Sequence, residues 1–169
     1  MKDFREIRVE KVTVNMGVGQ SGEELDKAIT VLQKLTEAKP VKTVCKVRQP
    51  TWGIKKGLTI GAKVTLRKEK AVKFLKEALK AKDNQIKEKS FDKTGNFGFG
   101  VDEHIDLGIK YDPTIGIYGM DFFVVMGRAG TRVSRRRRQA SKIGVGHKVS
   151  KDESMKWFQQ KYEGIITTK

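Results

Sequence analysis

Strict alternation of apolar and polar residues predicts strands in two parts of the chain. Residues 58–67 place apolar side chains on one face and polar or cationic side chains, without an acid, on the other. Residues 11–16 alternate in the same way, with Val12 and Val14 on the inner face and Asn15 on the outer face. A period of two is that of a strand with one buried and one solvated face, which favours an antiparallel sheet.

Two further segments are predicted as strands from their composition. Residues 41–48 are rich in β-branched side chains and alternate between a basic face and an inner face. The basic face holds Lys42, Lys46 and Arg48, whereas Cys45 falls on the inner face and is predicted to be a core residue. The apolar run within residues 117–126 predicts the last core strand.

Helical spacing of apolar residues predicts two helices after the first and third strands. Ser21 and Glu24 have the spacing of a capping box, so the first helix is expected to begin there and to end after Lys39, before Pro40. The second helix is predicted from about residue 68 to residue 81, with its lysines outward. Residues 82–96 are polar and punctuated and are predicted to form a long loop.

A third helix is predicted near the end of the sequence. Ser150 and Glu153 form a second potential capping box, which marks the start of that helix. Its apolar anchors are expected to be Met155, Trp157, Phe158 and Tyr162.

Together these elements predict an α+β fold with a largely antiparallel sheet and helices packed on one face. The other face of the sheet is expected to be polar and basic, with Asn15 and Thr65 next to each other on it. Residues 1–127 are predicted to form one α+β domain, and residues 128–169 a basic arm and a terminal helix docked on the same domain.

The positive charge of the chain is concentrated in two segments. The 169 residues carry a formal net charge of +16, and 18 of the 36 lysines and arginines lie in two acid-free stretches, 38–68 and 122–151. Such unpaired like charges repel one another and persist where a partner neutralises them, so a polyanion is the expected partner. A solvated basic face is the simpler alternative.

Several classes of protein do not fit this composition. Cys45 is the only cysteine and there are only two histidines, so neither an internal disulfide nor a Cys/His zinc site can form. The acids within residues 102–106 alternate between faces and are predicted to be solvated loop residues, without a metal ion. Because no signal-like start and no apolar run of 18 residues is present, we expect a soluble, unsecreted protein with no membrane partner.

The arginine-rich segment 132–138 and the glycines that follow it are too charged to pack without a partner. We interpret this segment as a binding arm. Two alternatives are a nuclear-import signal and an arm that binds duplex DNA.

Residues 17–22 spell Gly-x-Gly-x-x-Gly after a strand, which suggests a dinucleotide loop and an NADP-dependent oxidoreductase. Such a fold needs strands that are buried on both faces and an acid about twenty residues after the glycines. Neither is present, and the matching position is Arg48. We therefore predict no enzyme and no cofactor, and expect the glycine amides to hold an RNA phosphate.

Aromatic residues at two places could contact RNA bases. Trp52 lies between cations in a loop rich in Pro and Gly and is a candidate for contact with a base or a ribose. Phe97 and Phe99 are weakly similar to the stacking strand of an RNA-recognition motif, although core aromatics are the favoured interpretation.

Seven segments in the same order resemble the large-subunit ribosomal protein L-five family in its archaeal and eukaryotic form. They span nearly the whole chain, and so they are far more specific than any single motif. The matching segments are residues 12–19, 57–67, 90–97, 103–106, 111–120, 135–138 and 157–162.

The resemblance implies a non-enzymatic, cytoplasmic protein of the ribosome that binds 5S ribosomal RNA in the central protuberance. Implied neighbours are large-subunit ribosomal RNA, P-site tRNA, an L-eighteen-type ribosomal protein and the small-subunit head protein at an intersubunit bridge, with no homo-oligomer. In the family, Asn15 and Thr65 would contact 5S RNA. A third family contact uses a Gln where this chain has Ala38, which lacks the amide for that bond.

The predicted RNA-binding residues come from charge and from the resemblance together. For ribosomal RNA they are Asn15, Gly17, Gly19, Lys39, Lys42, Lys46, Arg48, Lys63, Thr65, Arg67, Arg132, Arg135, Arg136, Arg137, Arg138, Lys142, His147 and Lys148. For the loop that would face tRNA they are Gln49, Thr51, Trp52, Gly53, Lys55 and Lys56.

Overall fold

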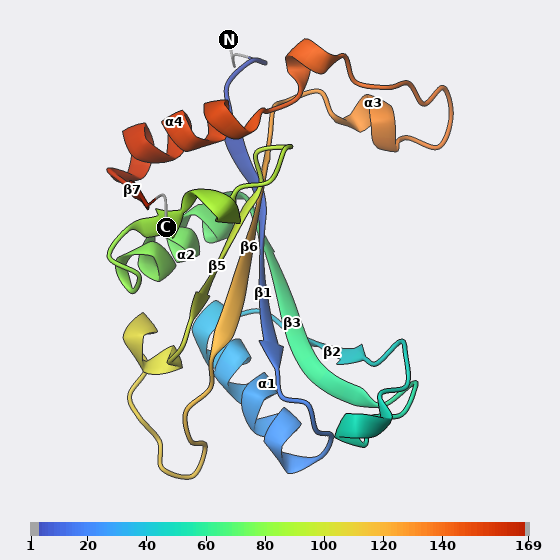
Figure 1. Ribbon diagram of the computed structural model, residues 1–169, viewed down its shortest axis with the longest axis vertical. Coiled ribbons are helices and arrows are strands. Elements are labelled where there is room, and N and C mark those ends of the chain that lie inside the picture. Colours follow the sequence, from blue (N-terminus) through green and yellow to red (C-terminus); the bar gives the residue numbers. More distant parts are fainter. Residues whose placement is uncertain (1–3, 168–169) are drawn as a thin grey trace.

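The computed structural model describes residues 4–167. Its main sheet has five strands, and it is curved, with helices along one side (Figure 1). Residues 1–3 of the predicted domain 1–127 and residues 168–169 of the predicted arm and terminal helix lie outside the described residues. The strands and helices are β1 (Arg8–Gly17), α1 (Glu23–Thr36), β2 (Val41–Val44), β3 (Thr59–Arg67), α2 (Lys68–Lys80), β4 (Gln85–Lys87), β5 (Phe97–Val101), β6 (Met120–Gly127), α3 (Arg132–Arg135), α4 (Lys151–Tyr162) and β7 (Ile165–Thr167). Short 3-10 turns are η1 (Pro50–Trp52), η2 (Glu88–Ser90), η3 (His104–Leu107) and η4 (Val145–His147).

The main sheet has the order β2-β3-β1-β6-β5, and every neighbouring pair of strands is antiparallel. Val14 of the central strand lies opposite Val64 on one side and Phe122 on the other, and all three side chains are buried. Their neighbours Thr13 and Asn15 point to the opposite face. The alternation in the sequence therefore sets which face of the sheet joins the core.

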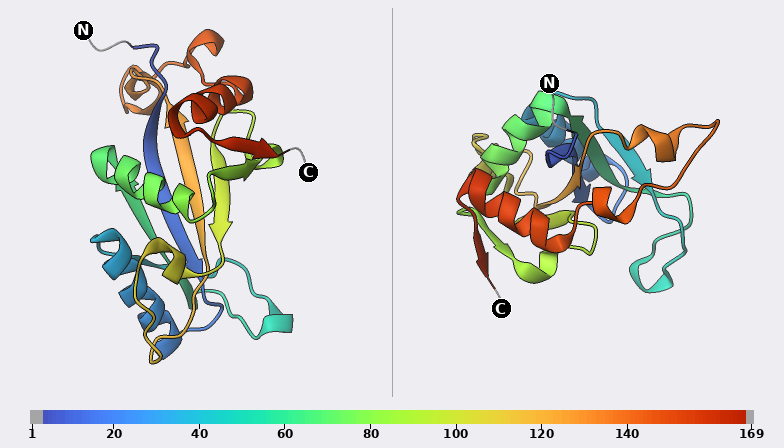
Figure 2. Two further views of the ribbon diagram at one scale, coloured as in Figure 1. Left: turned by 90° about the vertical axis from the view of Figure 1, so that its left-hand side faces the viewer. Right: turned by 90° about the horizontal axis from the view of Figure 1, so that it is seen from above.

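Helices α1 and α2 cover the inner face, and α4 lies across one end of the sheet (Figure 2). Leu25, Leu32 and Leu75 are fully buried against the strands, as the helical spacing of apolar residues predicts. The predicted α+β fold with helices on one face is thus confirmed.

The terminal helix closes the core through aromatic side chains. The ring of Phe158 is fully buried and lies 6.1 Å from that of Phe91 and 5.7 Å from that of Phe97. The predicted capping box is also confirmed, because Ser150 Oγ accepts from the Glu153 amide and the Glu153 carboxylate accepts from the Ser150 amide. Ser154 Oγ donates to the Gly95 carbonyl oxygen at 2.6 Å and joins the helix to the loop before β5.

The predictions of both ends of α1 and of the loop at residues 82–96 are wrong. The N-cap of α1 is Gly22, and Ser21 is exposed and makes no cap. The helix ends at Thr36, because Glu37 adopts a left-handed conformation, which stops the helix before Pro40. Residues 82–96 are not one loop, since β4 pairs in parallel with β7.

The interpretation of Phe97 and Phe99 as core residues is confirmed. Phe97 is buried, and Phe99 stacks on Phe122 with 5.0 Å between the ring centroids. Both side chains lie on the helix side of β5, so neither ring is available on the outer face of the sheet.

We predict that Phe158→Ala lowers the free energy of unfolding by about 3–5 kcal/mol, because it removes a buried ring from the aromatic cluster. Urea unfolding monitored by circular dichroism would measure this change. Ile165→Ala, at an exposed position of β7, serves as the control and should change stability little. An equal loss in both variants would mean that α4 is not part of the core.

Candidate nucleic-acid interface

The face of the sheet away from the helices, hereafter the open face, carries the polar pair predicted from the sequence. Asn15 lies opposite Lys63 across β1 and β3, and Thr13 lies opposite Thr65. These two pairs follow each other on the same face, so Asn15 and Thr65 are diagonal neighbours. The prediction that they lie side by side and point outward is confirmed, with Thr65 exposed and Asn15 half-buried.

Charges on the open face are divided between its two halves. Lys63 and Arg67 are exposed on β3, and Lys11 lies opposite Arg67. The acid Asp121 lies on β6, opposite Asn15. A phosphate backbone would therefore be attracted to the β1–β3 half, since cations are concentrated there.

The glycine turn after β1 does not offer the phosphate cradle that the sequence suggested. The backbone amides of Val18 and Gly19 both donate to the Ile60 carbonyl oxygen, at 3.0 and 2.9 Å. The first turn of α1 also carries Glu23, Glu24 and Asp26, whose charges repel an anion. The prediction that the amides of this turn hold a phosphate is wrong for Val18 and Gly19, and the same bonds argue against a dinucleotide site.

The orientation of β2 is the reverse of the one predicted. Val41 lies opposite Lys63 and therefore on the open face, where it is 60% exposed, and Val47 is 66% exposed. Lys42 points to the helix side, where Nζ lies 2.8 Å from Asp26 Oδ1. Cys45 is only partly buried, so its assignment to the core is also wrong. Lys39, Lys46 and Arg48 are exposed, as predicted.

The loop between β2 and β3, hereafter the Trp52 loop, is held in shape by its own backbone. Gln49 and Ile54 form a bridge, and Cys45 exchanges hydrogen bonds with Leu58 and Gly57. Trp52 at its tip is 74% exposed. All six residues predicted to face tRNA are exposed. The backbone hydrogen bonds of the loop hold the segment that presents them.

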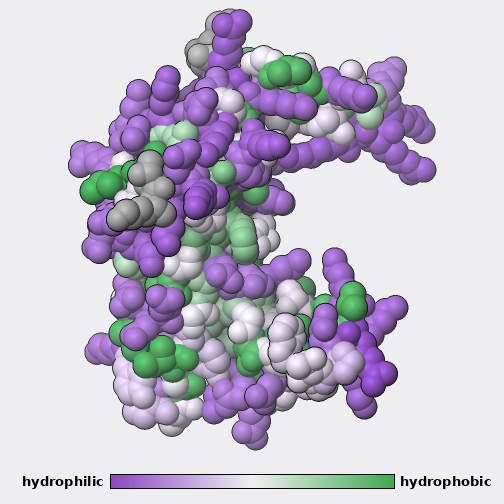
Figure 3. Space-filling view, viewed as in Figure 1, coloured by the Kyte–Doolittle hydropathy of each residue, from purple (hydrophilic) through white to green (hydrophobic). Residues whose placement is uncertain are grey.

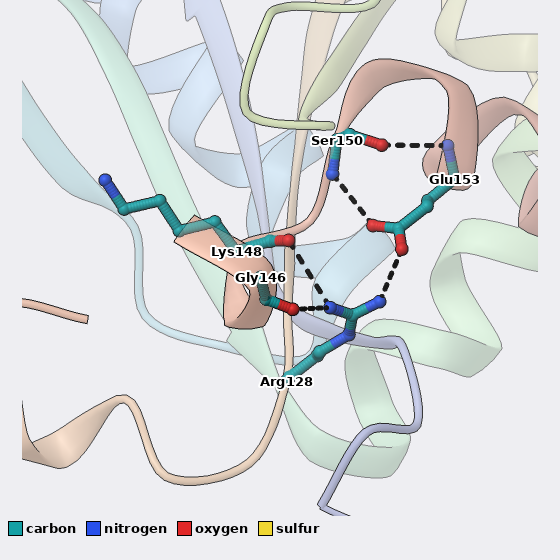
Figure 4. A network of polar contacts seen from close by, with 5 residues as sticks. All are labelled: Arg128, Gly146, Lys148, Ser150 and Glu153. Carbon is teal, nitrogen blue, oxygen red and sulfur yellow. Dashed lines mark hydrogen bonds and ion pairs between the residues drawn. The ribbon is translucent and has the colours of Figure 1, made fainter. Parts of the chain in front are cut away.

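Arg128 holds together the two ends of the arm, residues 129–147 (Figure 4). One guanidinium nitrogen donates to the carbonyl oxygens of Gly146 and Lys148 at 3.1 and 3.4 Å, and the other to Glu153 Oε1 at 2.8 Å. His147 Nε2 lies 2.7 Å from the Ala129 carbonyl oxygen and ties the same two segments together. Arg128 and His147 therefore act within the protein.

A second contact joins the arm to β1. Both terminal nitrogens of Arg135 donate to the two carboxylate oxygens of Glu10, which lies at an irregularity of the β1–β6 pairing. The hydrogen bond from Arg135 holds the pKa of Glu10 below its ordinary value, against the opposing effect of burial. Within residues 4–167, the exposed arm cations whose side chains make no hydrogen bond or ion pair are Arg132, Arg137, Arg138, Lys142 and Lys148.

The arm and the Trp52 loop project from opposite ends of the sheet on the same side. Figure 3 shows the resulting hollow, with hydrophilic residues on both projections and a floor of mixed polarity between them. The open face lies at the bottom of this hollow (Figure 1). A convex polyanion can fit into this hollow and contact the arm, the open face and the Trp52 loop.

The loop after β5 lies outside this hollow. Asp102 and Glu103 are exposed, as predicted, whereas His104 is buried. The Tyr118 hydroxyl donates to Glu24 Oε2 at 2.6 Å, and burial together with this carboxylate raises the pKa of Tyr118 to about 12.

Within residues 4–167, no group of three or more His, Cys, Asp or Glu side chains is placed to hold a metal ion. No helix in the same range is long and apolar enough to cross a membrane.

A one-sided sheet with a basic open face and two projecting basic segments is typical of an RNA-binding scaffold. Comparison with known families agrees: residues 3–55 match the model described as ribosomal protein L5, and residues 59–157 match the model of the C-terminus of the same ribosomal family. The chain is 54% identical to the large ribosomal subunit protein uL5 of Nanoarchaeum equitans over 159 residues, which cover 93% of this chain and 94% of that protein. It is 47% identical to uL5 of Chlamydomonas reinhardtii over 166 residues, 98% of each chain.

The chain belongs to the ribosomal protein L5 family. It is a structural constituent of the large ribosomal subunit, it works as part of the ribosome in the cytoplasm, and it is not an enzyme. Ribosomal RNA is accordingly its partner, and the oxidoreductase alternative is set aside.

We predict that Glu10→Gln loosens the arm, because it removes the charge that pairs with Arg135. Trypsin cleavage in the segment 135–138 at neutral pH should become up to about fivefold faster, since an exposed pair of this kind contributes up to about 1 kcal/mol. Glu69→Gln, on the surface of α2, is the control. Unchanged cleavage in Glu10→Gln would show that the pair does not restrain the arm.

The same contact should depend on pH. Because the native pKa of Glu10 is lowered from 4.5, the stabilisation by the pair is present above that value and is lost as the pH falls through the lower native pKa. Amide chemical shifts of the arm should therefore change in acid in the wild type, with a midpoint below 4.5. Glu10→Gln should lack this transition, and a transition of the same size in both proteins would assign it to another group.

Proposed function

We propose that the open face binds 5S ribosomal RNA and anchors it to the large subunit. The observation that carries the proposal is the position of Asn15 and Thr65, which lie side by side on the open face next to Lys63 and Arg67. An amide and a hydroxyl both donate and accept hydrogen bonds, so they suit 2′-hydroxyl groups and phosphate oxygens. The flanking cations supply the attraction to the RNA backbone.

The shape of the molecule supports the same function. Folded RNA is recognised mainly through its wide, shallow minor groove and its backbone, which the polar face of a sheet can contact over a large area. The hollow between the arm and the Trp52 loop restricts how a duplex can lie on that sheet (Figure 3). The free cations of the arm would then contact large-subunit RNA beyond the 5S site.

The Trp52 loop is the proposed contact for P-site tRNA. Its exposed Trp ring can stack on a base or a ribose, and the exposed Lys55 and Lys56 can pair with phosphates. The further proposed neighbours are an L-eighteen-type ribosomal protein and the small-subunit head protein at an intersubunit bridge. At the third family position, Ala38 is half-buried beside the core and would contribute no side-chain hydrogen bond to RNA.

We predict that Asn15→Ala weakens binding to a 5S RNA transcript about fivefold, because one hydrogen-bonding side chain of the open face is lost. The salt dependence should stay unchanged, since no phosphate-binding charge is removed. Fluorescence anisotropy across a salt series measures both quantities. Gln33→Ala, which removes an exposed amide side chain from α1 on the other side of the sheet, is the matched control.

A different response is expected when charges of the arm are removed. Replacing Arg137 and Arg138 by Gln should lower the slope of log affinity against log salt by about 1.4–1.8 for large-subunit RNA that contacts the arm. Binding of the isolated 5S RNA should change less. Equal changes of slope in this variant and in Asn15→Ala would contradict the separate roles of the arm and the open face.

Duplex DNA is the control ligand for the whole proposal. Contact with phosphates alone does not distinguish DNA from RNA, whereas the 2′-hydroxyl does. Competition by duplex DNA as strong as that by 5S RNA would overturn the proposal and would revive the hypothesis of a DNA-binding protein.

A further inference from the structure

A recess lies along the edge of the open face, where β5 carries two glycines on its outward side. Gly98 lies opposite Phe123 of β6, and Gly100 lies opposite Asp121. Without side chains at these two positions, the edge strand leaves room above its backbone. The resulting recess has a volume of about 660 Å³, which is ample for a nucleobase and its ribose.

Phe123 leans over the first glycine. A Cβ atom at Gly98 would lie 3.1 Å from the Phe122 carbonyl oxygen and 3.3 Å from Phe123 Cδ1, so the neighbouring backbone and the Phe123 ring together leave no space for a side chain there. The ring is nevertheless 51% exposed, although it is large and apolar. An aromatic ring held against a strand with much of its surface free is the usual platform for stacking a base.

Asp121 takes the same position over the second glycine. Its Oδ1 would lie 3.5 Å from a Cβ atom at Gly100, so the carboxylate stands at the side of the recess. Within residues 4–167 this exposed carboxylate makes no hydrogen bond or ion pair. It is therefore an acceptor that is available to a ligand.

Two other polar residues that line the recess, Asp92 and Asn96, already have hydrogen-bond partners within the protein. The Asp92 carboxylate accepts hydrogen bonds from the amides and side chains of Thr94 and Asn96, and Asn96 Oδ1 accepts from the Met126 amide. Burial alone would raise the pKa of Asp92, but these hydrogen bonds outweigh it and the pKa is lowered. These two side chains are thus fixed in place, whereas the Asp121 carboxylate is free to bind a ligand.

The recess is continuous with the proposed RNA surface. Phe123 lies opposite Thr13 in the neighbouring strand, and Thr13 lies opposite Thr65, so the three side chains form one row across the sheet. Asp121, Asn15 and Lys63 form the next row. A strand whose phosphates follow Lys63 and Arg67 would bring an unstacked base to Phe123.

We propose that this recess binds an unstacked RNA base that carries an exocyclic amino group, namely adenine, cytosine or guanine. The base stacks on Phe123, and its amino group donates to the Asp121 carboxylate. Uracil has no such amino group and is disfavoured. The proposal rests on the function given above, because RNA on the open face is what delivers the base.

The chemistry of the recess favours a base over other occupants. A phosphate would meet the carboxylate of Asp121 and be repelled. An apolar side chain of a protein would gain from Phe123 but would desolvate Asp121 without pairing it. A base satisfies both groups, since it has an aromatic face and an amino edge.

The test compares Phe123→Leu, Phe123→Tyr and Asp121→Asn with the wild type, in binding to a 5S RNA transcript and to ten-residue single strands of A, C or U. Loss of stacking in Phe123→Leu should weaken both kinds of binding by at least about fivefold. Phe123→Tyr keeps an aromatic ring and should bind like the wild type. The wild type should prefer the A and C strands to U. Asp121→Asn should reduce that preference.

Controls separate stacking from folding and from simple exposure. Tyr111→Leu removes another exposed ring, 54% exposed but in the loop before β6, and should bind both RNAs like the wild type. Urea unfolding of each variant shows whether the sheet is intact. Phe123→Leu with normal stability and weakened binding supports a role in recognition.

The failures of the two proposals can be told apart. Suppose that Asn15→Ala weakens 5S binding, while Phe123→Leu has no effect and the A, C and U strands bind equally. The recess then has no role in binding a base, and this inference is wrong. If a Phe123-dependent preference for A and C is found without preferential 5S binding, the recess stands and the proposed function is wrong.

Discussion

The structure depends on one constraint, the one-sided burial of β1 and β3. Val12, Val14 and Met16 must all enter the core, so the register of β1 cannot slip by one residue without reversing every side chain of that strand. The same constraint fixes Asn15 and Thr65 on the other face as neighbours. Burial of the apolar side chains on one face of the sheet thus also determines which polar side chains lie on the other face, where RNA could bind. The hydrophobic effect positions these polar groups although it does not act on them directly.

Local patterns predicted the elements that local physics decides. The strand around Val64 and the helix capped by Ser150 follow from alternation and from a capping box within a few residues. The predictions failed where a distant partner decides: β2 alternates, but its pairing with β3 turns Val41 outward. β4 and β7 are too short to be recognised alone, because their parallel pairing across the chain is what makes them strands.

The candidate site was predicted in its position more fully than in its details. Charge placement and the resemblance located the two basic segments, yet a basic residue in the sequence does not show what its side chain binds. Lys42 pairs with Asp26 and Arg135 with Glu10, the latter across 125 positions of the chain. Phe123 is hidden in an apolar run, and only the register with Gly98 shows that it lies on the outer face. Pairings at such separations leave no periodic signal in the sequence.

The closure of the arm by Arg128 has a consequence for how the chain can change over evolutionary time. The ends of the segment 129–147 are held next to α4 by the same carboxylate that caps that helix, and Arg135 is paired with Glu10 of β1. The part of the segment whose length the core does not sense therefore lies after Arg135. Lengthening such a closed loop costs little, about 0.6 kcal/mol for each doubling. The tip of the arm is therefore free to gain or lose residues, while Arg128 and Glu153 have to be kept together.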